Sequence, residues 1–134
     1  MTQEQPSFFR CYVRFAGAGL VAAGVVAAIG CILDPANARA AVAGCGATWA
    51  AGCAGAVPTA SALSTNPRGA GLAALTSTGV RFGAVLLLVV PLVLSGWFPR
   101  TALVVFVAVS YLTTLIVDSV MTVRMIQRFS GSNR

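Results

Sequence analysis

The sequence contains no histidine and no lysine, and its only acidic residues are Glu4, Asp34 and Asp118. Nine arginines supply the positive charge, so the net charge is +6. Charged residues make up 9% of the chain, whereas soluble domains carry about a quarter. So few charges could not cover the surface of a water-soluble globule of 134 residues. The composition therefore predicts a single unit that is embedded in a lipid bilayer.

The same absences exclude most kinds of chemistry. Without histidine, and with four cysteines that form no CxxC pair, a zinc or haem site would lack its usual ligands. The cysteines are expected to act as small buried apolar residues. There is no nucleophile elbow and no phosphate-binding loop, and the arginines are scattered without interleaved aromatics, which argues against nucleic-acid binding. We therefore expect no enzyme activity, no cofactor, no metal and no nucleic-acid partner.

Long apolar runs dominate what is present. Apolar residues make up 57% of the chain, and four runs approach the roughly 20 residues that a membrane-spanning helix needs: 13–33, 38–57, 78–96 and 101–123. The breaker DPAN ends the first run, Pro58 ends the second, and Pro91 is expected to kink the third. ANARA resembles a signal-peptide cleavage site, but the first run is longer than a usual signal core, so we expect it to remain as a helix.

The connections between the runs predict how the helices pair. The segments 34–37 and 97–100 are short, so each should join its two runs into a helical hairpin, whereas the segment 59–77 reads as a longer polar loop. These features predict an all-α protein: an integral membrane four-helix bundle that is built from two helical hairpins and forms one domain over residues 1–134.

The arginines are unevenly placed around these runs. The two short connections hold only Arg39 and Arg100, while seven arginines fall on the other side of a four-span protein: Arg10, Arg14, Arg68, Arg81, Arg124, Arg128 and Arg134. The positive-inside rule then places both termini in the cytoplasm and Trp97 and Phe98 at the outer interface. Zero lysine with abundant alanine, glycine and valine indicates a GC-rich bacterial genome, so the expected location is the cell inner membrane.

Small residues recur at helical spacing in the first two runs. Ala40, Gly44, Thr48, Gly52 and Ala56 recur every four residues, and Gly17, Gly24 and Cys31 recur every seven, beside Ala16, Ala23 and Gly30. Lipid supplies little hydrophobic drive between helices, and small residues let backbones approach closely instead. We expect helix packing at Gly44, Thr48, Gly52, Gly17 and Gly24. The contacts could lie inside one four-helix unit, or the stripe could dock another membrane protein.

The fourth run carries a polar stripe of Ser110, Thr114, Asp118 and Thr122. A carboxylate in a span costs about 2.5–3.5 kcal/mol at the helix centre, so it usually has a partner or a cavity. Arg81 and Asp118 lie about 22 and 26 Å of helix from the turn that joins their runs, which predicts an ion pair near the cytoplasmic edge. Arg14 is the alternative partner. Two other interpretations stay open: snorkelling to headgroups, and an ion-handling or partner-docking site that includes Thr114.

Four spans, a longer middle loop and cytoplasmic termini resemble the ATP synthase protein I family of small bacterial membrane proteins. The most local elements are STGVRFGAVLLLVV, in which Arg81 matches the family's basic residue, and the DP turn at Asp34 and Pro35. The chain departs from the family in two places. Thr59, where the family often has asparagine, follows Pro58, and Ser77 and Thr78 stand where an acid often precedes the basic residue.

The resemblance implies a chaperone-like helper that holds rotor subunits of the F-type ATP synthase while the rotor ring assembles. A link to magnesium or calcium transport has also been proposed for such proteins. The implied partners are membrane lipid and other membrane-protein subunits, among them the ATP synthase rotor subunits. Two alternatives remain: a structural accessory subunit of another membrane complex, and a small dimeric ion transporter.

Overall fold

The computed structural model describes residues 7–65 and 69–131, and these residues form four long helices without a strand. The helices are α1 (Phe8–Leu33), α2 (Ala38–Thr65), α3 (Ala70–Leu94) and α4 (Arg100–Gly131), with a short 3₁₀ helix, η1 (Pro35–Asn37), between α1 and α2. All four are long and apolar enough to cross a membrane. The predicted all-α four-helix bundle is confirmed, and the chain is a multi-pass membrane protein.

Local side-chain chemistry explains where the helices begin and turn. The Ser7 hydroxyl accepts a hydrogen bond from the Arg10 N–H and so caps α1. The Asn37 amide donates to the Asp34 carboxylate at 2.7 Å and closes the tight turn between α1 and α2. Between α3 and α4, Gly96 has a φ of +70°, a conformation that glycine adopts without steric cost. Both short connections therefore form where the sequence predicts them.

The prediction of a longer polar loop at 59–77 is wrong, because most of this segment is helical. Pro58 does not end the second helix but lies inside α2, which continues to Thr65, and α3 begins at Ala70. Packing compensates for the proline, since Ala56 and Ala60 are buried against Cys11 and Phe15 of α1. Pro91 also lies inside a continuous helix. The middle connection is therefore short, and Arg68 within it lies outside the described residues.

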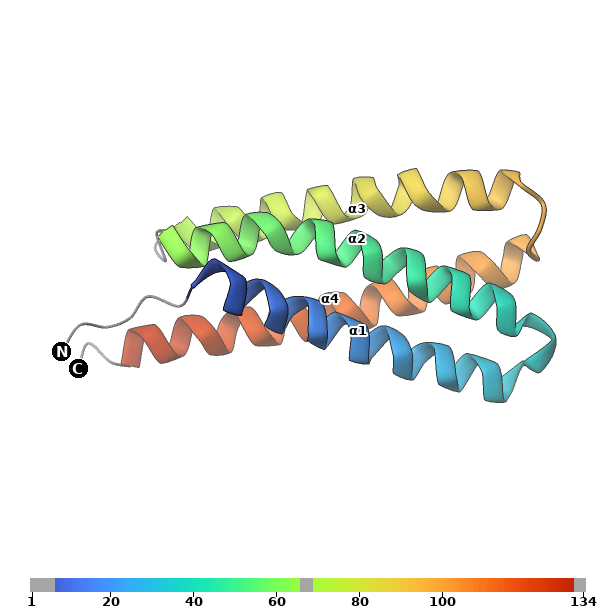
Figure 1. Ribbon diagram of the computed structural model, residues 1–134, viewed down its shortest axis with the longest axis horizontal. Coiled ribbons are helices and arrows are strands. Elements are labelled where there is room, and N and C mark those ends of the chain that lie inside the picture. The colour runs from blue at the N-terminus through green and yellow to red at the C-terminus, as the bar shows by residue number, and fades with distance from the viewer. Residues whose placement is uncertain (1–6, 66–68, 132–134) are drawn as a thin grey trace.

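Helix α2 is the centre of the bundle. It packs against α1, α3 and α4, and α1 packs against α4 as well. By contrast, α3 and α4 touch at few points although a tight turn joins them. Figure 1 shows both chain ends at the same end of the bundle, where α2 also passes into α3. The second hairpin is thus open along much of its length, and α3 is held mainly by α2.

Small residues let α2 take this central place. A Cβ built on Gly44 would lie 3.1 Å from Val107 Cγ2 and 3.5 Å from the Leu103 oxygen, so α4 passes close to the α2 backbone there. Thr48 is completely buried, and its hydroxyl donates to the Gly44 carbonyl at 2.9 Å. The packing role expected for Gly44 and Thr48 therefore has a direct structural basis.

Two of the expected packing glycines in α1 do not pack within the chain. Gly17 and Gly24 are exposed, and a Cβ built on either would meet no atom within 4 Å. The inward face of α1 uses the neighbouring stripe instead, with Ala23 and Gly30 buried. The reason is helical geometry, because residues one position apart point about 100° away from each other. The prediction that Gly17 and Gly24 pack against another helix of the chain is therefore wrong.

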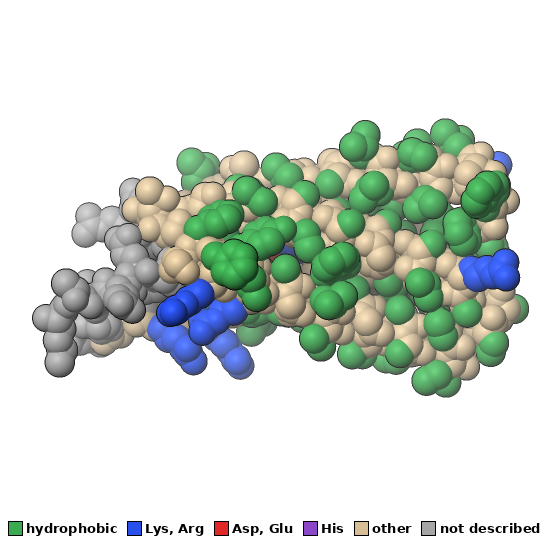
Figure 2. Space-filling view, in the orientation of Figure 1, with side chains coloured by type: hydrophobic (Ala, Val, Ile, Leu, Met, Phe, Trp, Pro, Cys, Tyr) green, Lys and Arg blue, Asp and Glu red, His purple; other side chains and the backbone are tan. Residues whose placement is uncertain are grey.

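Apart from Arg81 and Asp118, the charged residues that the structure describes gather at the two ends of the molecule. Figure 2 shows basic side chains near the end that holds the termini and others at the opposite end, with a broad apolar middle between them. Arg81 should be left out of the arginines that flank the helices, because it lies inside α3 and is buried. Arg134, like Arg68, lies outside the described residues. Trp97 is 85% exposed in the turn at the opposite end.

Candidate functional site

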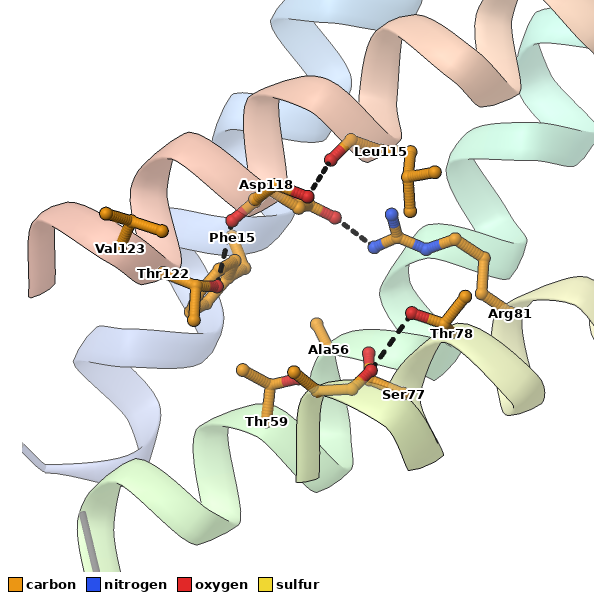
Figure 3. Close-up of a pocket in the computed structure, with 12 residues that line it drawn as sticks. Phe15, Ala56, Thr59, Ser77, Thr78, Arg81, Leu115, Asp118, Thr122 and Val123 are labelled. Carbon is orange, nitrogen blue, oxygen red and sulfur yellow. Dashed lines mark hydrogen bonds and ion pairs between the residues drawn. The ribbon is translucent and has the colours of Figure 1, made fainter. Parts of the chain in front are cut away.

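The most polar part of the bundle interior is an ion pair between α3 and α4. An Nη atom of Arg81 donates to the Asp118 carboxylate, and Figure 3 shows the guanidinium pointing across the gap between the two helices at that carboxylate. The Arg81 side chain is 5% exposed and that of Asp118 is 14% exposed. Two charges this deeply buried need each other, since desolvation of either alone costs several kcal/mol.

The pair lies deeper than the sequence predicts. Arg81 is eleven residues after the start of α3 and thirteen before its end, or about 16 Å from the end of the helix nearest the chain termini. The prediction placed the pair at the cytoplasmic edge because it began this helix at residue 78. Since α3 begins at Ala70, the pair lies near the middle of the helix and not at its edge.

Contacts with α2 fix the position of Arg81. The Arg81 guanidinium also approaches the Gly52 carbonyl at 3.5 Å, and one turn earlier the Ser77 hydroxyl donates to the Gly55 carbonyl. A Cβ built on Gly55 would lie 3.1 Å from Arg81 Cβ and 3.1 Å from the Ser77 oxygen. Glycine at position 55 thus lets α3 lie against α2 at a distance that no other residue permits without displacement.

A cavity of about 240 Å³, whose lining is more apolar than polar, opens from the ion pair between α3 and α4. It reaches Ala74, seven residues before Arg81, so it runs about 10 Å along α3 toward the end that holds the termini. Phe15 of α1 and Ala56 of α2 form part of its apolar wall. Figure 3 shows the polar side chains around this space, and they are Thr59, Ser77, Thr78, Arg81, Asp118, Ser119 and Thr122.

Two buried atoms at the end of this cavity lack a partner among the described residues. They are Nε of Arg81, a donor, and Oδ1 of Asp118, an acceptor. An unsatisfied buried polar atom costs about 1–3 kcal/mol, and such an atom calls for a particular explanation. Beyond the pair, toward the opposite end, Thr114 and Trp49 close the space around Gly52 tightly. The space is therefore closed on the side of the pair that faces away from the chain termini.

The other predicted members of this site lie nearby without joining it. Thr114 is buried, but its hydroxyl donates to the Ser110 carbonyl, and its methyl group packs near Gly19 and Gly52. Arg14 is exposed on α1, whereas the partner of Asp118 is Arg81. The alternative prediction, that Arg14 pairs with Asp118, is therefore wrong. Trp49 supplies a different contact, because its indole N–H donates to the Ala16 carbonyl at 3.1 Å and ties α2 to α1.

A second candidate surface is the outward stripe of α2. Gly46, Ala50 and Ala54 are spaced four residues apart and are exposed, and a Cβ on Gly46 would meet nothing within 4 Å. We call these three residues the small-residue face. The outward surface of α4 carries large apolar side chains instead, such as Leu112 and Ile116. That of α3 is mixed: Phe82, Leu87 and Leu94 are exposed, but so are Gly79 and Gly83, where a Cβ would meet nothing within 4 Å.

Sequence reasoning missed several residues of the cavity. Ser77 lies in the segment predicted as a loop, although it precedes Arg81 by four residues, the spacing that places two side chains on one helical face. Gly55 recurs at four-residue spacing with Ala43, Ala47 and Ala51, but nothing in the sequence separates it from these neighbours. Extending the third helix back through Ser77 would have placed its hydroxyl beside the arginine.

Comparisons with protein-family models, with curated proteins and with solved structures find no match to this chain.

Proposed function

We propose that the chain is an accessory or assembly factor that holds other membrane-protein subunits against its small-residue face. The observation that supports this most is that Gly46, Ala50 and Ala54 are all exposed on one face of α2, with no atom within 4 Å of a Cβ at Gly46. Lipid gains nothing from a small-residue face, whereas a second helix can approach it closely and gain packing. Gly17 and Gly24 add two further open positions on the neighbouring α1.

The resemblance to ATP synthase protein I suggests which subunits are held. We infer that they are the rotor subunits of the F-type ATP synthase, and that the chain holds them while the rotor ring assembles. A bacterial inner membrane and cytoplasmic termini belong to the same proposal. The arginines that flank the helices support this orientation, because Arg10, Arg14, Arg124 and Arg128 are on the side of the termini, against Arg39 and Arg100 on the other.

One other function has an observation in its favour. The cavity and the Arg81–Asp118 pair are features that transporters use, since ionisable residues inside membranes often mark ion pathways. A small ion transporter is therefore the second candidate. It is less favoured because Thr114, Trp49 and Gly52 close the space beyond the pair.

Copurification tests the accessory function. We expect the wild-type protein, tagged and extracted in mild detergent, to copurify with a defined set of membrane subunits, with the rotor subunits first among them. Gly46→Leu should lose these subunits, because the leucine projects from the small-residue face where no atom of the chain lies within 4 Å. Leu87→Ala on the outward side of α3 is the matched control and should retain them. Equal recovery of the subunits with both variants would contradict the proposal that this face binds them.

A further inference from the structure

The charges at the end of the cavity sum to zero. Arg81 contributes one positive and Asp118 one negative charge, and they are in contact. A simple cation attracted by the carboxylate is repelled by the guanidinium beside it, and a simple anion meets the reverse. A ligand that carries both charges, in the opposite order, gains from both residues. The pair also leaves each residue incompletely satisfied, because Arg81 Nε and Asp118 Oδ1 are buried without a hydrogen-bond partner among the described residues.

Four of the five hydroxyls around the cavity add acceptors rather than donors. Thr78, Ser119 and Thr122 donate to the backbone carbonyls of Ala74, Leu115 and Asp118, each four residues earlier. Ser77 donates to Gly55 of α2. Because a hydroxyl has one proton and two lone pairs, these oxygens retain only lone pairs for a ligand. A group with several N–H donors, such as a primary ammonium, suits them.

We propose that the cavity binds a small zwitterion that carries a primary ammonium and an oxyanion. The ammonium lies against Asp118 and the lone pairs of Thr122 and Ser119, and the oxyanion lies against the guanidinium of Arg81. The volume of about 240 Å³ holds roughly eight water-sized groups, which suits a molecule of the size of phosphoethanolamine. This chemistry occurs in the headgroup of phosphatidylethanolamine and in free phosphoethanolamine.

The site uses none of the residues of the small-residue face. It can therefore fail without affecting the proposed function, and the proposed function can fail without affecting the site. Its ligand reaches the ion pair from the direction of Ala74, because the cavity extends toward that residue and is closed beyond Thr114.

Reconstitution in nanodiscs tests the proposal with matched lipids. Phosphatidylcholine carries the same phosphate and the same net charge as phosphatidylethanolamine, but its quaternary ammonium has no N–H. We expect phosphatidylethanolamine, or free phosphoethanolamine added to phosphatidylcholine discs, to raise the melting temperature of the protein, and phosphatidylcholine with added choline phosphate to leave it unchanged. If only phosphatidylethanolamine raises the melting temperature, the ligand is a lipid headgroup. If free phosphoethanolamine raises it, the ligand is a soluble compound.

A pair of threonine variants separates the site from a general effect of the bilayer. Thr122→Val removes a lone-pair acceptor from the cavity wall and should weaken binding about tenfold, the value of one hydrogen bond to a charged group. Thr113→Val is the control, because Thr113 also donates to the carbonyl four residues earlier but does not line the cavity. Both should melt like the wild type in phosphatidylcholine. The proposal is overturned if no zwitterion shifts the melting temperature, or if both variants respond as the wild type does.

Discussion

Asp118→Asn should lower the free energy of unfolding by about 3–5 kcal/mol, because it leaves the Arg81 guanidinium buried without a counter-charge. The Arg81 side chain is 5% exposed, and a guanidinium cannot lose its proton in a protein. Arg81→Gln should lower the free energy of unfolding by less, about 1–3 kcal/mol, because the Asp118 side chain is more exposed than that of Arg81 and a carboxylate, unlike a guanidinium, can be neutralised by a proton. The double variant should lose less than the two single losses combined, with a coupling of about 0.5–3 kcal/mol.

Reversible unfolding in detergent micelles measures all four members of this cycle. Asp34→Asn serves as the control, since Asp34 also accepts a side-chain hydrogen bond but lies in the turn after α1. Its effect should stay within about 1 kcal/mol. Losses that simply add would mean that Arg81 and Asp118 do not stabilise one another. Equal losses in the two single variants would contradict the difference in burial and in protonation on which the expected order rests.

Gly55→Leu should disrupt the contact between α2 and α3. The first added carbon already lies 3.1 Å from Arg81 Cβ and from the Ser77 oxygen, and neither is the free end of a flexible side chain. Overpacking of this kind costs about 1–3 kcal/mol, and here it also displaces Arg81 from Asp118. We therefore expect Gly55→Leu to lower the melting temperature in detergent more than any other single glycine variant of α2.

The matched control is Gly46→Leu, which makes the same chemical change in the same helix. No atom lies within 4 Å of a Cβ at Gly46, so its melting temperature should stay close to that of the wild type, within about 0.5 kcal/mol of stability. Gly52→Ala should be tolerated as well, since its nearest neighbour lies at 3.7 Å. If Gly55→Leu and Gly46→Leu melt alike, α3 does not lie against α2 as described.

The ion pair could be predicted from the sequence because both residues interrupt apolar runs. A single carboxylate and a single arginine, at matching distances from one turn, leave few other partners. The depth of the pair could not be predicted, because it depends on where α3 begins. Pro58 and the serines and threonines after it resemble a loop, and only burial of Ala56 and Ala60 against α1 explains why the helix continues.

The orientation of the small residues could not be predicted either. Gly17 and Gly24 have the same spacing as Ala23 and Gly30, and the sequence treats the two stripes alike. The choice between them depends on the rotation of α1 about its axis, which contacts with α2 and α4 determine. The cavity escaped prediction for a similar reason, because α3 and α4 are joined by a tight turn yet stay apart over much of their length.

Site-specific photo-crosslinking tests the accessory function most directly. Val57 continues the small-residue face along α2 and is 44% exposed, whereas Leu87 on α3 is 76% exposed. A diazirine amino acid of the size of leucine can replace either residue without filling the face itself. We expect irradiation of cells to link position 57 to a rotor subunit of the ATP synthase, while position 87 links to lipid. A crosslink to one different membrane subunit would keep the accessory function and reject the rotor ring. Only lipid adducts at both positions, in cells that contain the intact protein, would contradict the proposed function itself.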